Sequence, residues 1–131
     1  MKTLSLHSKV TATLAVAALD ADATVNGTGV GIGAFNSAMV VILAGTIADG
    51  THTFEVQDSN DNSTFAAVAN AYLEGTEPVL DDTDSDTVTV IGYKGTKKYL
   101  RVSVTSATTT DGGTFGALVI CGDPTRSPVV R

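Results

Sequence analysis

The sequence is short of cysteine and aromatic residues, and these shortages argue against two kinds of protein. Its one cysteine, Cys121, cannot form an intramolecular disulfide, so the chain is not a disulfide-rich secreted scaffold. Cys121 follows the apolar run 117–120, and we expect its thiol to be buried, as free cysteines usually are. Trp is absent and only three Tyr and four Phe are present, which makes a carbohydrate-binding surface of exposed aromatic rings a weak alternative.

Basic residues are also scarce. Eight Lys and Arg stand against fourteen Asp and Glu, and the net charge is −6. Because nucleic-acid binding depends on cations placed against phosphates, we expect no nucleic-acid partner. The same charge disfavours an anionic membrane surface, and no apolar stretch reaches the roughly 18–20 residues that span a bilayer, so we expect no membrane partner. His7 and Lys9 interrupt the N-terminal segment, which is expected to be mature sequence rather than a signal peptide.

The residues that are abundant favour β-structure. A length of 131 residues fits one domain, and a hydrophobic content of 43% is too high for a disordered chain. Val, Ile and Thr are frequent, and their β-branched side chains fit a pleated sheet better than a helix. Thirteen glycines interrupt the chain at short intervals, which is typical of short strands joined by turns.

Seven segments are expected to form strands. Residues 10–19 predict a first strand or an extended arm, with a short helix as the alternative because alanine favours helices. Residues 35–44 contain an apolar run between two glycines and predict a buried strand. The other predicted strands are 51–57, 65–73 (as a strand or a helical turn), 87–93, 98–105 and 114–121.

The segments between these strands are expected to be turns and loops: 20–33, 58–63, 74–86 and 106–113. Strands at this spacing predict an all-β fold, an antiparallel β-sandwich or small jelly-roll-like barrel with extended N- and C-terminal arms. Within this single domain we assign residues 1–34 to an N-terminal arm and Gly-rich loop, 35–122 to the sandwich core and 123–131 to an extended C-terminal tail.

No combination of residues resembles an active site, and we expect that the protein is not an enzyme. The only histidines are His7 and His52, and a Gly-x-Ser-x-Gly motif is absent. His52 lies on the apolar side of its predicted strand, so it is expected to be a structural histidine. The carboxylates of 74–86 lack the apolar neighbours that raise the pKa of a catalytic acid.

We also expect no cofactor. Residues 58–62 have oxygen-bearing side chains, but Ser63 replaces the glycine and Ala69 the glutamate that an EF-hand requires. Asx-turns explain this segment without a metal. A weak calcium site at Asp81, Asp82, Asp84 and Asp86 is the remaining alternative for a metal. The glycines of 27–33 lack the Lys-Ser/Thr of a phosphate-binding loop and indicate flexibility or a close backbone approach.

A basic cluster follows the acidic segment. It consists of Lys94, Lys97, Lys98 and Arg101. Lysines at such positions commonly protect strand edges from pairing with other chains. The alternative is a contact between copies, in which the acidic residues Asp81, Asp82, Asp84 and Asp86 of one copy meet the basic cluster of the next.

Several stretches together resemble a known family. Residues 50–59 (GTHTFEVQDS) are followed by 65–69 (FAAVA), 73–78 (LEGTEP) and 91–102 (IGYKGTKKYLRV). The order resembles that of small proteins encoded beside the major capsid gene of tailed phages, over roughly residues 40–122. The most specific part is Gly-Tyr-x-Gly-x-Lys-x-Tyr-x-Arg, from Gly92 to Arg101; the chain departs from the family at Phe65, where a Trp is usual.

The resemblance implies a capsid decoration (cement) protein. Such a protein would bind the major capsid protein on the outer surface of the phage head, as a homo-oligomer and by family analogy a trimer. The acidic charge agrees with the outer surface, because DNA inside the head repels it. The terminal segments are expected to act as arms on neighbouring subunits. A tail or baseplate β-domain and a carbohydrate-binding module of the particle are the alternatives.

Overall fold

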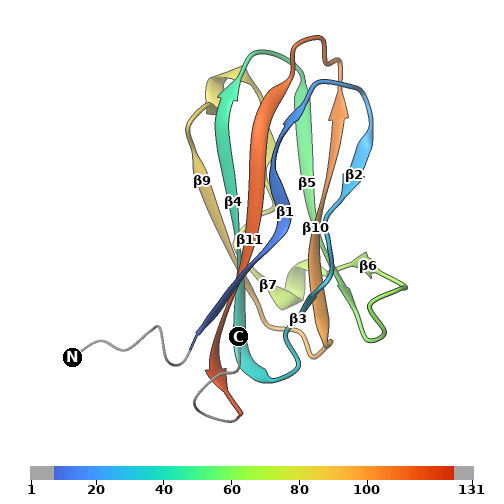
Figure 1. The fold of residues 1–131 in the computed structure, drawn as a ribbon, viewed down its shortest axis with the longest axis vertical. Helices are drawn as coiled ribbons and strands as arrows, with labels where there is room; N and C mark the ends of the chain where they lie inside the picture. Colours follow the sequence, from blue (N-terminus) through green and yellow to red (C-terminus); the bar gives the residue numbers. More distant parts are fainter. Residues whose placement is uncertain (1–7, 126–131) are drawn as a thin grey trace, which may run out of the picture.

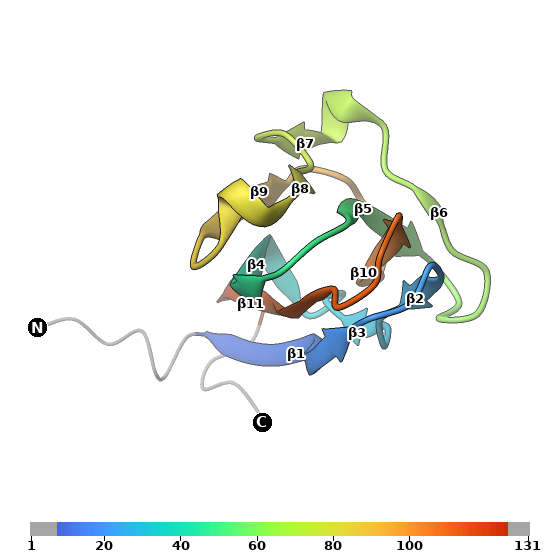
Figure 2. The same cartoon turned by 90° about the horizontal axis from the view of Figure 1, so that it is seen from above.

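A computed structural model describes residues 8–125. Two antiparallel sheets pack face to face (Figures 1 and 2). The first sheet has the order β1-β11-β4-β9-β7; the second has β2-β10-β5-β6, with β3 also paired to β10 and β8 to β5. The elements are β1 (Lys9–Leu19), β2 (Thr24–Asn26), β3 (Val30–Gly31), β4 (Phe35–Ile47), β5 (Thr51–Ser59), β6 (Ala66–Ala67), η1 (Asn70–Tyr72), β7 (Leu73–Glu74), β8 (Val79–Leu80), η2 (Asp82–Asp84), β9 (Val88–Tyr93), β10 (Tyr99–Ala107) and β11 (Gly113–Pro124).

The strand order is that of a jelly roll. The first and last strands, β1 and β11, are neighbours in one sheet, and the strands next to them in sequence, β2 and β10, are neighbours in the other. Two interlocked Greek keys produce this order. Figure 2, seen from above, separates the layer of β9, β4, β11 and β1 from the layer of β5, β10 and β2. The all-β sandwich prediction is therefore confirmed, and the sheets do not close into a barrel.

Alternating side chains place the core between the sheets. In β5, His52, Phe54 and Val56 are buried, and the intervening residues face outward. The register of β5 with β10 is unbroken from Tyr99 opposite Ser59 to Ala107 opposite Thr51. The largest fully buried apolar side chains come from both sheets: Phe54, Leu100, Phe115, Ile42 and Ile91. Burial of one such side chain contributes about 1.5–3 kcal/mol to stability.

The N-terminal segment is integrated into both sheets. β1 pairs with β11 from Lys9 to Leu19, with two register shifts, so the helical alternative is wrong for this segment. The Gly-rich loop contains β2 and β3, and the expected close backbone approach is real at Gly27, where an added Cβ would lie 2.6 Å from the carbonyl oxygens of Thr13 and Val102. The outer parts of the predicted arm and tail, residues 1–7 and 126–131, lie outside the described residues.

The segments expected to be a mixed strand and an acidic loop form short pieces along the edges of the sheets. β6 and β8 pair with opposite parts of β5, and β7 pairs with β9. Between β6 and β8, the Glu77 carboxylate accepts a hydrogen bond from the backbone N–H of Val56 at 2.6 Å. The Glu77 side chain thus accepts the hydrogen bond that this N–H could otherwise donate to a strand of another chain. This protects the edge of the sheet against pairing with other chains.

Candidate interaction surface

The acidic residues 81–86 satisfy one another and their own backbone. Asp81 accepts hydrogen bonds from the backbone and hydroxyl of Thr83, and Asp84 accepts one from the backbone N–H of Asp81, which makes a capping box around η2. The Thr83 hydroxyl is the main reason that the pKa of Asp81 is lowered. Among residues 8–125, no group of three or more His, Cys, Asp or Glu side chains is arranged to hold a metal ion. The alternative calcium site therefore gains no support.

These residues belong to a larger acidic end of the sandwich. The β1–β2, β4–β5 and β10–β11 connections lie at the same end of the sandwich as η2, at the top of Figure 1. Asp49 holds two of them together, since its carboxylate accepts hydrogen bonds from the backbone of Thr110, Asp111 and Gly112. These bonds, above all that from Gly112, lower the pKa of Asp49. The acidic end comprises Asp20, Asp22, Asp49, Asp81, Asp82, Asp84, Asp86 and Asp111.

The basic cluster lies toward the opposite end, but its members diverge. Lys94 pairs with Glu74 across β9 and β7 at 3.8 Å, and both side chains are largely exposed, so the pair contributes little to stability. Arg101 lies on the outside of the second sheet, where its Nε donates to Gln57 at 2.7 Å and its guanidinium stacks 4.2 Å from the centroid of the Phe65 ring. The two charge clusters are separated by the length of the strands, and the predicted contact between copies stays a prediction.

The Gly92–Arg101 motif builds the turn between β9 and β10. Tyr93 is buried, and its hydroxyl donates to Asp58 at 2.8 Å and accepts from the backbone N–H of Lys97 at 3.1 Å. Burial and the Asp58 carboxylate raise the pKa of Tyr93 to about 12. Gly95 lies against the Tyr93 ring, where an added Cβ would collide with the hydroxyl group. The motif thus has a structural role, and Tyr93 does not offer a ring to a sugar.

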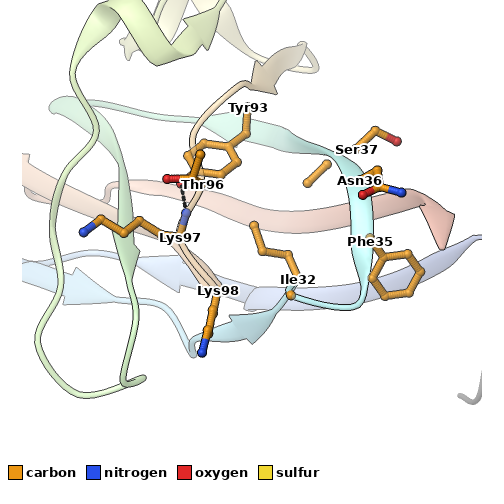
Figure 3. A pocket seen from close by; sticks show the side chains of 10 residues that line it. Ile32, Phe35, Asn36, Ser37, Tyr93, Thr96, Lys97 and Lys98 are labelled. Carbon is orange, nitrogen blue, oxygen red and sulfur yellow. Dashed lines mark hydrogen bonds between the residues drawn. The ribbon is translucent and has the colours of Figure 1, made fainter. Parts of the chain in front are cut away.

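A shallow pocket lies beside this turn. Its lining includes Ile32, Phe35, Asn36, Tyr93 and Lys97, and its volume is about 240 Å³. In Figure 3 the Lys97 and Lys98 ammonium groups extend away from Phe35 and Asn36, so they do not converge on one position inside the pocket. The pocket therefore lacks the convergent polar groups that fix a small ligand.

The Cys121 side chain is fully buried, as predicted, and the His52 side chain is fully buried as well. Burial raises the pKa of the Cys121 thiol, which keeps it protonated and unreactive. The ring of His52 packs 4.6 Å from that of Phe115, and its two nitrogens are hydrogen-bonded to Ser106 and to the carbonyl of Asp49. Neither side chain is accessible to a substrate. No helix within residues 8–125 is long and apolar enough to cross a membrane.

The most unusual surface is the outside of the first sheet. Val41 lies between Leu118 of β11 and Val90 of β9, and the rows above and below are also apolar. Val10, Val16, Val88 and Val90 are more than half exposed, at 59%, 72%, 61% and 53%. We call the following residues the outer apolar face: Val10, Ala12, Val16, Met39, Val41, Leu43, Val88, Val90, Leu118 and Ile120.

The second sheet is the opposite case. Apart from Val79, which is 58% exposed, and Ala107, its outward residues on β2, β5 and β10 are mainly polar: Thr24, Asn26, Thr51, Thr53, Glu55, Gln57, Arg101, Ser103 and Thr105. Antiparallel sheets usually alternate apolar inside and polar outside, and only the second sheet does. The sequence signal of the outer apolar face was the run 39–43, which predicted a strand buried on both sides; β4 is instead covered on one side only.

Comparison with known proteins identifies the fold. No protein-family model matches the chain, and no curated protein sequence matches it. Among solved structures, the PBSX exported protein XepA is similar with a TM-score of 0.60 and 18% identity; the match covers 100% of this chain and 42% of XepA. The chain therefore spans less than half the length of XepA, and at this identity the likeness establishes a shared fold.

Two further structures are less similar. The infectious bursal disease virus Gx strain structure has a TM-score of 0.48 at 12% identity, covering 92% of this chain and 34% of the viral chain. The cyanophage Pam1 capsid asymmetric unit has a TM-score of 0.47 at 16% identity, covering 89% of this chain and 85% of the phage chain. These two scores are too low to establish a common fold, and the chain is best described as a jelly-roll sandwich of the kind found in part of XepA.

Proposed function

We propose that this protein is a structural component of a tailed-phage particle, a decoration protein that binds the major capsid protein on the outer surface of the head. The observation that carries the proposal is the outer apolar face. A contiguous apolar patch on the outside of a sheet, bordered by polar residues, is often a site of protein contact. A protein that works by lattice contacts needs surfaces of this kind and no active site.

The charge distribution supports the same role. Fourteen acidic against eight basic residues give the whole chain a charge of −6, which opposes placement beside packaged DNA. The resemblance of residues 40–122 to decoration proteins also supports it, and Phe65, the position where the family usually has Trp, is the ring on which Arg101 stacks. Trp provides the stronger cation–π partner, so Phe65 retains the contact in a weaker form.

The proposal is tested by counting copies of this protein in purified particles. Quantitative mass spectrometry against an isotope-labelled standard of residues 102–126, which trypsin releases between Arg101 and Arg126, gives the number of copies per major capsid subunit. We expect a ratio near one, or a simple fraction of one. A ratio near one in a hundred would indicate a tail or baseplate component instead, and absence from the particle would overturn the proposal.

Chemical labelling of intact particles tests the proposed location on the outer surface of the head. Lys94, Lys97 and Lys98 are exposed, so an amine reagent that cannot enter the head should label them equally in intact and in disrupted particles. Labelling only after disruption would place the protein inside. The carbohydrate-binding alternative predicts glycan binding that disappears on substitution of Tyr93 or Tyr99; the burial of Tyr93 disfavours it.

A further inference from the structure

We propose that the outer apolar face pairs with the same face of a second copy, with the strands of the two copies running antiparallel across the contact. The inference concerns how two copies of the chain associate. It draws on the same outer apolar face as the proposed function: if a second copy covers this face, the face is a contact between copies and the capsid protein binds another part of the surface. The copy number in particles and the mass in solution test the two proposals separately. The basis of the inference is the shape, the area and the charge around the outer apolar face.

The shape of the face favours a second sheet as its occupant. The outer apolar face is the outside of a sheet, and sheets pack on sheets with their strands within about 30° of alignment. When the same surface of two copies meets itself, the contact is closed by a twofold axis. A dimer is therefore the natural result, rather than the trimer that the family resemblance implies.

The area is sufficient for a stable dimer. β4 and β11 have 13 and 12 residues, which at about 3.3 Å per residue corresponds to about 40 Å. Four strands spaced about 4.8 Å apart add a width of about 19 Å. The whole outer surface of this sheet thus measures on the order of 760 Å², close to the roughly 800 Å² that each partner buries in a standard interface, and the outer apolar face, which spans Met39 to Leu43 on β4, forms its centre. Its apolar centre and charged ends match the core and rim of such interfaces.

The charges select the orientation. Asp20 follows β1 and Asp86 precedes β9 at the acidic end, whereas Lys9 begins β1 and Lys94 follows β9 at the other end. If the twofold axis ran along the strands, the acidic ends of the two copies would lie together and repel. If it runs across the strands, each acidic end lies over the end of the other copy that carries Lys9 and the Lys94–Glu74 pair, and the repulsion between acidic ends is avoided.

The mass of the protein in solution tests the pairing. Sedimentation equilibrium from about 1 μM to about 1 mM, the range of common interface affinities, should give twice the 13.3 kDa of one chain. Val41→Glu, at the centre of the outer apolar face, should reduce the mass to that of a monomer. Thr53→Glu, which adds the same charge to the outside of the second sheet, should leave the dimer intact.

A second variant, Val90→Glu, keeps the test valid if Val41→Glu does not fold. Val90 is 53% exposed, so its replacement disturbs no core contact. Circular dichroism should show that both Glu variants keep the wild-type fold. A monomeric or trimeric wild-type protein would overturn the inference, as would a dimer that survives Val41→Glu and Val90→Glu in folded form. In the first case the face belongs to another partner, such as the capsid shell.

A spin label at the acidic end tests the orientation. Thr110 is exposed in the β10–β11 connection, so the label is attached to the cysteine introduced by Thr110→Cys. Cys121 is fully buried and will not react with the label in the folded protein. In the antiparallel dimer the two labels lie about one strand length apart, roughly 40 Å. A distance below about 20 Å would show that the acidic ends lie together and would overturn the antiparallel arrangement.

Discussion

At the scale of single residues, every buried side-chain nitrogen and oxygen within residues 8–125 has a hydrogen-bond partner. His52 has no exposed surface; its Nε2 donates to the Asp49 carbonyl at 3.1 Å, which leaves Nδ1 as the acceptor of the Ser106 hydroxyl at 2.8 Å. Ser106→Ala removes that donor and leaves a buried nitrogen unsatisfied. We expect a loss of about 1–3 kcal/mol in the free energy of unfolding, measured by urea denaturation. Thr105→Ala, an exposed neighbour on the same strand, should change it by less than about 0.5 kcal/mol.

Asp61 gives a pH dependence whose sign follows from its hydrogen bonds. Its carboxylate accepts from the backbone of Thr64 and Ser63 and from the Ser59 hydroxyl, which lowers its pKa from 3.8 to about 2. Because the folded pKa is the lower one, this group stabilises the protein above pH 3.8 and loses that effect as the pH falls through about 2.

Asp61→Asn should therefore flatten the fall in unfolding free energy between about pH 4 and pH 2, as measured by urea denaturation across that range. Asp82→Asn is the control, since its side chain accepts no hydrogen bond within the described part of the chain, and it should keep the wild-type slope. An unchanged slope in Asp61→Asn would show that these bonds do not favour the ionised form.

At the scale of strands and turns, segments in which apolar and polar residues alternate were predicted correctly, whereas a segment without this alternation led to a wrong expectation of burial. The segments 51–57 and 98–105 alternate cleanly and became β5 and β10. The run 39–43 has no alternation, because Met39, Val41 and Leu43 are apolar although they face outward. Sequence reasoning expects burial on both sides of such a strand, and it cannot tell whether the covering surface belongs to the same chain. The outer apolar face was missed for this reason.

The turn between β9 and β10 depends on one hydroxyl group. Tyr93→Phe removes its bonds to Asp58 and to the Lys97 backbone, and should lower the free energy of unfolding by about 1.5–3 kcal/mol, the usual contribution of a hydrogen bond to a charged group. Tyr99→Phe is the matched control and should have a smaller effect.

The same hydroxyl is tested by titration. Since the folded pKa of Tyr93 is raised to about 12, its contribution is complete below pH 10 and is lost as the pH rises through about 12. Ultraviolet titration of the wild type should show one of the three tyrosines ionising near pH 12, and that step should vanish in Tyr93→Phe. Its persistence would mean that another tyrosine carries the raised pKa.

At the scale of the whole molecule, charge is separated along the strands. Eight aspartates occupy the acidic end, and every described basic side chain lies toward the other. The sequence showed an acidic segment at 81–86, but it could not show that Asp20, Asp22, Asp49 and Asp111 join it, because the connections that carry them meet only when both sheets form. The other end also carries Asp58, Asp61, Glu74 and Asp123, so its charges nearly cancel. Uncompensated negative charge is therefore concentrated at the acidic end, whose carboxylates repel one another.

This repulsion should be measurable as a salt-dependent stability. Carboxylates within a few ångströms of one another repel at low ionic strength, and at about 0.15 M salt the screening length falls to about 8 Å. The midpoint of thermal unfolding should therefore rise with salt.

The triple substitution Asp20→Asn, Asp82→Asn and Asp111→Asn should raise this midpoint at low salt and reduce its salt dependence. Asp123→Asn, toward the other end, should do neither. Scans at two protein concentrations separate this effect from association, because only association depends on concentration. A midpoint that does not respond to salt in either protein would mean that the acidic end is neutralised within the fold.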